Sequence, residues 1–387
     1  MRLIPYGRQD INQDDVDAVA SVLTSDWLTQ GPMLGKFEAA MAAHCDVPYA
    51  FAVNSGTSAL HLACLALGVG PGDTVWTSPN TFVASANCAL YCGAGIDFVD
   101  IDLATGNLST DRLEEKLQQA AREGTLPKVV IPVHFAGQSC DMLAVRRLAD
   151  AYGFAVIEDA SHAVGGRYQG VPVGSCTYSD ITVFSFHPVK VLTTAEGGMA
   201  LTRSPQLAST LERLRSHGIT RDPALLQSEA DGPWYYEQHD LGFNYRMTDL
   251  QAALGLSQLT RLDSFVQRRL EIAEQYASRL AGLPLEPLAV SPGVNSSWHL
   301  YVVRVEARQR RSFFDALRAQ GLGVQVHYIP VHVQPYYRER GFRPGQYPAA
   351  EEHYARSLSL PTFPAMDGAE LNEVLRRIER AVDEVFV

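Results

Sequence analysis

Phe154-Ala-Val-Ile-Glu-Asp159 and Ile181-Thr-Val-Phe-Ser-Phe-His-Pro-Val-Lys190 are the two runs that decide the fold of this chain. The apolar part of each run has the length of a buried strand. A charged side chain, Asp159 in the first run and Lys190 in the second, ends the run. With histidine counted as neutral, Lys190 is the only charged side chain between residues 181 and 195. Because ligands bind beyond the carboxyl ends of parallel strands, we expect Asp159 and Lys190 to converge on one site.

The chain on the amino-terminal side of these runs alternates short apolar stretches with helical patterns. Strands are predicted at 49–55, 74–78, 96–101, 128–135 and 154–158, and helices at 57–67, 81–91, 110–122 and 141–152. The strands are continuously apolar, which is typical of a parallel sheet covered on both faces. A further pair of strands, 181–186 and 199–202, has no helical crossover and is predicted to be antiparallel. The fold class is therefore α/β, with a mostly parallel central sheet flanked by helices.

The pattern changes in the carboxyl-terminal third. Residues 221–238 read as a long loop, and one helix is predicted from 248 to 280. After Pro284 the strands 300–305 and 324–329 and the helices 310–319 and 370–385 predict a smaller α+β domain. We expect a large domain at 1–247, a bridging helix at 248–283 and a small domain at 284–387.

Composition excludes several classes of protein. The chain has 387 residues, 46% of them hydrophobic, and a formal net charge of −11. This charge argues against a nucleic-acid or membrane-surface binder. His and Cys are not clustered at ligand spacing, so no metal is expected. No signal peptide and no apolar run of the roughly 18 residues that span a bilayer is visible, so we expect a cytoplasmic protein.

The run Asn54-Ser-Gly-Thr-Ser58 adds a third element of chemistry. A glycine turn leads from a strand into a helix, whose free N–H groups and dipole attract a phosphate. A phosphate site, a carboxylate and a desolvated lysine together fit pyridoxal phosphate. The lysine would form a Schiff base with the aldehyde, and the carboxylate of Asp159 would hold the proton of the pyridine nitrogen.

Each candidate has an ordinary structural explanation as well. Ser or Thr at the start of a helix is usually a simple cap. His162 could contact the phenolic oxygen of the cofactor or be a structural histidine, and Phe82 could stack on the ring or pack in the core. Ser185 is a candidate for the phosphate. Asn244 could reach a phosphate, also across a subunit interface.

The chain resembles the sugar nucleotide aminotransferases of the DegT/DnrJ/EryC1/StrS family, which are fold-type I pyridoxal phosphate enzymes. The resemblance covers nearly the whole chain. The segments that carry it are Ser55-Gly-Thr-Ser-Ala-Leu60, Glu158-Asp-Ala-Ser-His162, Ser185-Phe-His-Pro-Val-Lys190, Glu196-Gly-Gly198 and Gly242-Phe-Asn-Tyr-Arg246.

The resemblance implies a role for each matching residue. The phosphate is expected at Gly56, Thr57, Ser58 and Ser185, the ring nitrogen at Asp159 and the Schiff base at Lys190. It also implies a homodimer in which Asn244 reaches the cofactor of the partner subunit. His162 stands where many members carry glutamine, and either side chain can donate to the cofactor. Relatives that dehydrate their substrate carry histidine in place of the lysine, so Lys190 favours transamination.

Within the family, Ile4-Pro-Tyr-Gly7, Ser25-Asp-Trp-Leu-Thr-Gln-Gly-Pro32 and His327-Tyr-Ile-Pro-Val-His332 are similar to the transaminases of the pseudaminic acid pathway. That similarity implies a UDP-linked 4-keto-6-deoxy-N-acetylhexosamine, UDP-2-acetamido-2,6-dideoxy-β-L-arabino-hexos-4-ulose, as substrate and L-glutamate as amine donor. Keto sugars of the perosamine or bacillosamine type are alternatives, and a pyridoxal phosphate-binding regulator is the non-enzymatic one. Candidates for the sugar site are Tyr6, Arg246, His327 and Tyr328, although core packing would also explain the last two.

Overall fold

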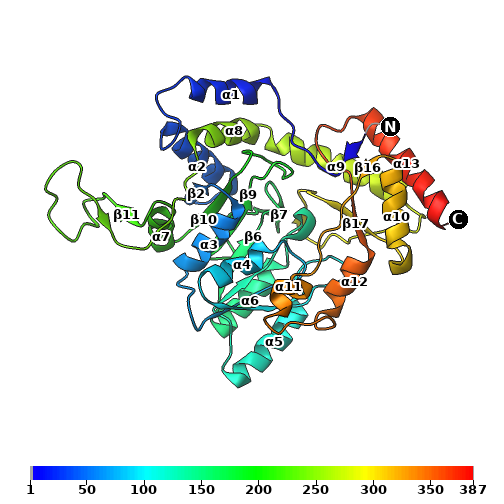
Figure 1. Ribbon diagram of the computed structural model, residues 1–387, viewed down its shortest axis with the longest axis horizontal. Coiled ribbons are helices and arrows are strands. Elements are labelled where there is room, and N and C mark those ends of the chain that lie inside the picture. The colour runs from blue at the N-terminus through cyan, green and yellow to red at the C-terminus, as the bar shows by residue number, and fades with distance from the viewer. Residues whose placement is uncertain (1–2, 387) are drawn as a thin grey trace.

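A seven-stranded sheet forms the centre of the computed structural model, which describes residues 3–386 (Figure 1). Its strands are β2 (Tyr49–Val53), β3 (Thr74–Thr77), β4 (Gly95–Phe98), β5 (Val129–Ile131), β6 (Ala155–Asp159), β9 (Ile181–Ser185) and β10 (Gly198–Thr202). The order across the sheet is β2-β10-β9-β6-β5-β3-β4. Strand β10 is antiparallel to both of its neighbours, and the other pairs are parallel. The prediction of a mostly parallel sheet with an antiparallel pair is confirmed.

Helices cover both faces of this sheet. They are α2 (Pro32–Cys45), α3 (Gly56–Ala66), α4 (Ala84–Tyr91), α5 (Thr110–Glu123), α6 (Met142–Tyr152) and α7 (Pro205–Arg215). Alternate residues of one strand belong to different cores: Val129 and Ile131 pack with α3 and α4, whereas Val130 packs with α5 and α6. Burial on both faces explains why the strands read as continuous apolar runs. The sequence patterns did not predict α2 and α7, nor α1 (Gln13–Leu23).

The single helix predicted for 248–280 is wrong. The structure has two helices, α8 (Asp249–Leu259) and α9 (Leu262–Arg279). Between them, the Thr260 hydroxyl donates to the carbonyl of Ser257 at 2.6 Å, and the Arg261 guanidinium turns to Asp10 at 3.0 Å. Local hydrogen bonds of this kind compete with the helical ladder and interrupt it.

The two helices nevertheless connect two separate cores. Leu262 and Phe265, at the start of α9, pack against the large sheet and α2. Ile272 and Tyr276, farther along α9, pack in the core of the carboxyl-terminal region. In Figure 1 the pair runs beneath α1 across the upper part of the molecule toward α13. The domain boundaries themselves stay predictions.

The carboxyl-terminal core has the expected α+β character. Its elements are β13 (Glu286–Pro287), β15 (Tyr301–Arg304), β17 (Ser357–Leu360), α10 (Ala307–Ala319) and α13 (Gly368–Phe386). The three strands form an antiparallel sheet in the order β13-β15-β17. The amphipathic helix α13 buries Leu371, Val374, Leu375 and Ile378 against this core.

The strand predicted at 324–329 is wrong. A shorter strand, β16 (Leu322–Gly323), precedes this segment and pairs in parallel with β1 (Ile4–Pro5) of the amino-terminal segment. Strand β17, which sequence analysis missed, takes the place beside β15, and Gln325 makes only an isolated bridge to it. Residues 324–329 are thus left as an extended connection toward the site.

The remaining elements are short. They are β7 (Arg167–Tyr168), β8 (Val171–Pro172), β14 (Val294–Asn295), β11 (Ile219–Thr220), β12 (Glu237–Gln238), α11 (Pro335–Arg338), α12 (Pro348–Arg356) and the 3-10 turns η1 (Phe135–Gly137) and η2 (Val331–Val333). Strands β11 and β12 form the base of a hairpin that projects from the body in Figure 1. In the part of the chain that the structure describes, no helix is long and apolar enough to cross a membrane.

Candidate active site

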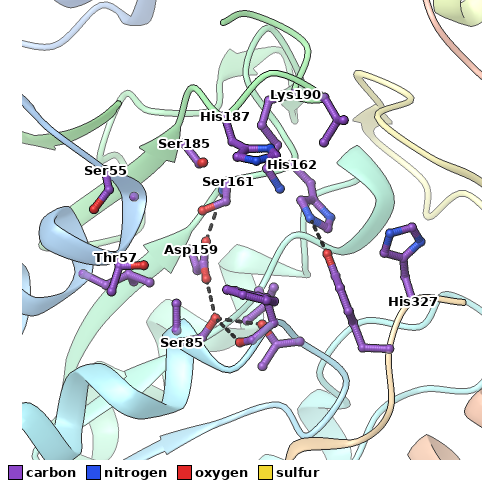
Figure 2. A pocket seen from close by; sticks show the side chains of 18 of the residues that line it. Ser55, Thr57, Ser85, Asp159, Ser161, His162, Ser185, His187, Lys190 and His327 are labelled. Carbon is purple, nitrogen blue, oxygen red and sulfur yellow. Dashed lines mark hydrogen bonds between the residues drawn. The ribbon is translucent and has the colours of Figure 1, made fainter. Parts of the chain in front are cut away.

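A cavity of about 460 Å³ lies at the carboxyl ends of β6 and β9. The first turn of α3, the start of α4 and the extended segment around Tyr328 close its other sides. Figure 2 shows Ser55 and Thr57 on one side, His162 and Lys190 on the other, and Asp159 between them. The structure therefore brings the predicted lysine, the predicted carboxylate and the predicted phosphate turn into one cavity.

The phosphate turn is built by close approach of three backbone segments. Ser55 caps α3 by accepting a hydrogen bond from the Ser58 N–H, and the N–H groups of Gly56 and Thr57, at the first two positions of the helix, have no partner within the helix. A Cβ on Gly56 would lie 3.0 Å from the Cβ of Ser185. A Cβ on Gly198 would lie 2.5 Å from the carbonyl oxygen of Ser55. Glycine at both positions therefore lets the three segments approach this closely at the helix terminus, where N–H groups can bind an anion.

The hydroxyls of this turn divide between two tasks. Thr57 and Ser185 line the cavity, as predicted for phosphate ligands. Ser58 is buried, and its hydroxyl donates to the side-chain oxygen of Asn54 at 2.6 Å. Ser58 therefore stabilises the turn in this structure, and its contact with a phosphate stays a prediction.

Asp159 ends β6 with its carboxylate in the cavity. One oxygen, Oδ1, accepts the N–H of Ser161 at 3.1 Å. The other, Oδ2, accepts the hydroxyl of Ser85 at 2.5 Å. Sequence analysis missed Ser85, because it lies 74 residues before Asp159 and on a different element. Together the two bonds hold both oxygens and so fix the orientation of the carboxylate in the cavity.

Lys190 provides the amine. Its side chain lines the cavity, and no hydrogen bond or ion pair within residues 3–386 holds its Nζ atom. Burial lowers the pKa of Lys190 to about 8, and the negative charge of Asp159 opposes that shift. An amine with this pKa is substantially neutral at mildly alkaline pH, and a neutral amine is the nucleophilic form.

Neutral aromatic and imidazole groups form the wall opposite the phosphate turn. The Nε2 atom of His162 lies 3.1 Å from the hydroxyl of Tyr328, and the ring of His299 packs 4.4 Å from that of His162. Burial and the Lys190 charge hold the pKa of His162 well below its usual value. The same causes lower the pKa of His327 to about 3. Among the described residues that line the cavity, Lys190 is the one lysine or arginine.

The carboxyl-terminal part of the chain contributes three residues to this wall. Tyr328 and His327 line the cavity from the extended segment rather than from the end of a strand. His299 is buried behind His162 and had no sequence signal, because an isolated histidine before a strand carries no pattern. Tyr6 also lines the cavity, and Phe82 stands exposed at its rim, 60% accessible.

Asn244 and Arg246 lie outside this cavity. Asn244 is exposed and forms a backbone bridge with Ser216. The Arg246 guanidinium donates to the Ser216 hydroxyl at 3.0 Å and lines a second cavity, of about 630 Å³, between α2, α7 and the β11–β12 hairpin. Neither residue meets Lys190 of its own chain, so their predicted roles depend on a second subunit or stay unassigned.

Residues 9–379 match the DegT/DnrJ/EryC1/StrS aminotransferase family. The chain belongs to this family. A spore coat polysaccharide biosynthesis protein of Bacillus subtilis, SpsC, is 40% identical over 98% of this chain and 97% of its own length. Among solved structures, a putative sugar aminotransferase of Streptococcus pneumoniae, Spr1654, has a TM-score of 0.90 at 31% identity, over 99% of this chain and 100% of that one. PseC of Helicobacter pylori, an aminotransferase involved in the biosynthesis of pseudoaminic acid, has a TM-score of 0.90 at 29% identity with the same coverage.

This aminotransferase uses pyridoxal phosphate, as the PLP and PMP forms of its structural neighbours indicate. Its own residues fit the cofactor: a helix terminus with unpaired N–H groups for the phosphate, a carboxylate for the ring nitrogen and a free amine for the aldehyde. When bound, the cofactor supplies an aldehyde that condenses with amines and a ring that accepts electrons. No group of His, Cys, Asp or Glu side chains in the described chain is arranged to hold a metal ion.

The lowered pKa of Lys190 predicts how the apoprotein captures its cofactor. The rate should rise with pH and level off above about pH 8, because the neutral amine attacks the aldehyde. An ordinary lysine would keep gaining rate up to about pH 10. Stopped-flow absorbance of apoprotein mixed with pyridoxal phosphate between these limits measures the profile. A rate that still climbs steeply above pH 9 would contradict the burial of this amine.

Proposed function

We propose that this aminotransferase transfers the amino group of L-glutamate to C4 of a UDP-linked 4-keto-6-deoxy-N-acetylhexosamine. The observation that carries the proposal is the unpaired amine of Lys190 in one cavity with Asp159 and an open helix terminus. The likeness to PseC supports the pseudaminic acid type of substrate. Segments at both ends of the chain, around Tyr6 and His327, reach the same cavity from the carboxyl-terminal core.

In this proposal Lys190 acts twice as a proton carrier. Its Nζ atom accepts the proton from Cα of glutamate in the first half of the reaction and delivers a proton to C4 of the sugar in the second half. The depressed pKa of Lys190 suits both directions, because the group can give and take a proton near the working pH. Asp159 keeps a negative charge beside the ring nitrogen throughout.

A second candidate is a different nucleotide-linked keto sugar. SpsC, at 40% identity, carries a name that refers to spore coat polysaccharide biosynthesis and not to pseudaminic acid. That name supports a sugar that is built into a polysaccharide, and the alternative is therefore another nucleotide-linked 4-keto sugar, of the perosamine or bacillosamine type. The side chains that face the sugar in either case are the half-buried Tyr6, His327 and Tyr328.

A substrate panel separates the two candidates. Purified protein with pyridoxal phosphate and glutamate is incubated with UDP-4-keto sugars that differ in configuration at C5 and in substitution at C2, and each product is identified by NMR. We expect the L-arabino 4-keto sugar to be aminated at C4 with the highest kcat/KM. Higher kcat/KM for a D-configured or non-acetylated sugar would refute the substrate proposal and leave the aminotransferase assignment intact.

We also propose a homodimer with shared active sites. Several aromatic and large apolar side chains are exposed between α1 and α2, at the end of α4, and in or beside the projecting hairpin: Trp27, Leu28, Tyr91, Trp234 and Leu241. Burial of these side chains against a second subunit would remove apolar surface from water. Asn244, exposed after the hairpin, is positioned for contact with a second subunit.

Complementation tests the shared site. Asn244→Ala and Lys190→Ala chains are co-expressed with different tags, and the mixed dimer is isolated. If Asn244 serves the partner's cavity, one of the two sites is intact and the mixed dimer should show about half the wild-type activity. If Asn244 acts within its own chain, each site lacks one residue and the mixed dimer should be as inactive as its parents.

We propose the cytoplasm as the compartment. All six cysteines are free thiols, five of them buried. Unpaired thiols are typical of a reducing environment, and a nucleotide sugar is a cytoplasmic metabolite in this proposal.

A further inference from the structure

Two buried hydroxyls stand behind Asp159 on the side away from Lys190's loop. The Ser85 hydroxyl, in the first turn of α4, lies 2.5 Å from Oδ2 of Asp159. The Thr81 hydroxyl, just before the helix, lies 2.7 Å from the Ser85 hydroxyl. Ser85 is 1% exposed and Thr81 is 2% exposed. Neither residue belongs to the family motifs that carried the resemblance.

The hydrogens of this pair can take one arrangement when Asp159 is charged. A carboxylate has no hydrogen to give, so the Ser85 hydroxyl donates to Oδ2. Ser85 has then used its single hydrogen, and Thr81 must donate to the Ser85 oxygen. The carbonyl of Phe82, 3.4 Å from the Ser85 oxygen, is a poorer acceptor than a carboxylate. The result is a directed chain from Thr81 through Ser85 to Asp159.

Such a chain has two physical effects on the carboxylate. Hydrogen bonds in series polarise one another, and a bond to a charged acceptor is about twice as strong as a neutral one. With the Ser161 N–H on Oδ1, the chain also holds both oxygens of Asp159 and so fixes the rotation of the carboxylate. A site that must hold one proton in one place needs both the charge and the orientation.

We propose that Ser85, supported by Thr81, is a positioning residue that keeps Asp159 charged and turned toward the ring nitrogen of the cofactor. Ser85 touches Asp159 and acts through it. The inference rests on the assignment of Asp159 to that nitrogen. In this proposal the hydroxyls of Ser85, in α4, and Thr81, just before α4, influence the positive charge of the cofactor ring through Asp159.

Other titratable groups near Asp159 are those of the opposite wall and of the Lys190 loop. Lys190 interacts with the Asp159 charge, and so does the half-buried Tyr328. His162 and His327 stay neutral, since burial and Lys190 lower their pKa values. The Ser85 pair is therefore a neutral donor on the α4 side, where a substitution changes no formal charge.

Ser85→Ala tests the inference through the pH dependence of the visible absorbance of the enzyme with bound pyridoxal phosphate. Without this donor the charged form of Asp159 is less stable, and the proton stays less firmly on the ring nitrogen. Because the ring is then less positive, the pKa of the nitrogen that joins Lys190 to the cofactor should rise. The pH midpoint of the visible absorbance band should therefore rise, by about one pH unit. kcat/KM should fall roughly 10-fold. Thr81→Val should move the midpoint in the same direction by less.

Two further variants keep the test decisive. Ser139→Ala removes another buried hydroxyl, one that donates to the Cys140 carbonyl outside the cavity, and should leave the midpoint unchanged. Ser85→Cys retains a side chain with a weaker donor, and its midpoint should lie between those of wild type and Ser85→Ala. If Ser85→Ala does not fold, the cysteine variant decides. A wild-type midpoint in folded Ser85→Ala or in folded Ser85→Cys would overturn the inference.

Asp159→Asn separates this inference from the assignment beneath it. Its midpoint should rise more than that of Ser85→Ala, because the charge itself is lost. A shift in Asp159→Asn without a shift in Ser85→Ala would leave the assignment standing and refute the role of Ser85. An unchanged midpoint in Asp159→Asn would refute both. Neither outcome depends on which sugar the enzyme uses.

Discussion

Lys190→Ala should lower turnover by roughly 10⁴-fold or more, because one amine serves as both covalent anchor and proton carrier. No other lysine within residues 3–386 lines the cavity to replace the unpaired Nζ atom, and the low pKa values of His162 and His327 make these two side chains poor bases. The visible absorbance of the lysine-bound cofactor should also disappear. The measurement is the release of 2-oxoglutarate from glutamate in the presence of the keto sugar, with the spectrum recorded on the same sample.

The matched control is Lys128→Ala. Lys128 forms a surface ion pair with Asp73 at 2.8 Å, far from the cavity lining. Exposed pairs of this kind contribute about 0–1 kcal/mol to stability, so this variant should keep its colour and turnover. Turnover that survives in Lys190→Ala, or vanishes equally in both variants, would contradict the assigned role of Lys190.

Asp159→Asn should lower kcat by roughly 10²–10³-fold, the range found when a preorganised electrostatic partner is removed. Asparagine has nearly the same shape, its amide oxygen can accept the Ser161 N–H, and its amide nitrogen can donate to the Ser85 hydroxyl, so the fold should be retained. It cannot balance a positive ring, and the electron-accepting capacity of the cofactor should fall. Steady-state kinetics and the affinity for pyridoxal phosphate measure the two consequences.

The adjacent carboxylate provides the control for Asp159. Glu158 is also buried, but its Oε2 atom lies 2.9 Å from Nε2 of His134, and it does not line the cavity. The Cys140 N–H donates to Nδ1 of that histidine, so a neutral ring with its hydrogen on Nε2 satisfies both contacts. Glu158→Gln should therefore have a much smaller effect on kcat. Equal losses in Glu158→Gln and Asp159→Asn would indicate a general effect of disturbing β6.

Much of the site could be predicted, because its main groups lie at strand ends. The runs that end at Asp159 and near Lys190 are local patterns, and parallel strands bring their carboxyl ends to one edge. The turn around Gly56 is equally local, since a strand, a glycine and a helix cap follow one another along the chain. The alternation of elements likewise predicted the main sheet.

What could not be predicted depends on contacts between distant segments. Ser85 reaches Asp159 from another helix, and His299 reaches His162 from the carboxyl-terminal region, so neither shows in a local pattern. The strand predicted at 324–329 failed because β1, from the other end of the chain, pairs with residues 322–323. The break before α9 depends on Arg261, which turns to acidic residues of the amino-terminal segment.

Reduction with borohydride tests the central claim most directly. The wild-type enzyme with bound pyridoxal phosphate is reduced, digested and mapped by mass spectrometry. We expect the reduced cofactor on the peptide that contains Lys190, and no adduct on the other lysines of the chain, Lys36, Lys116 and Lys128. An adduct on one of those three, or an active enzyme without an adduct on Lys190, would contradict the account.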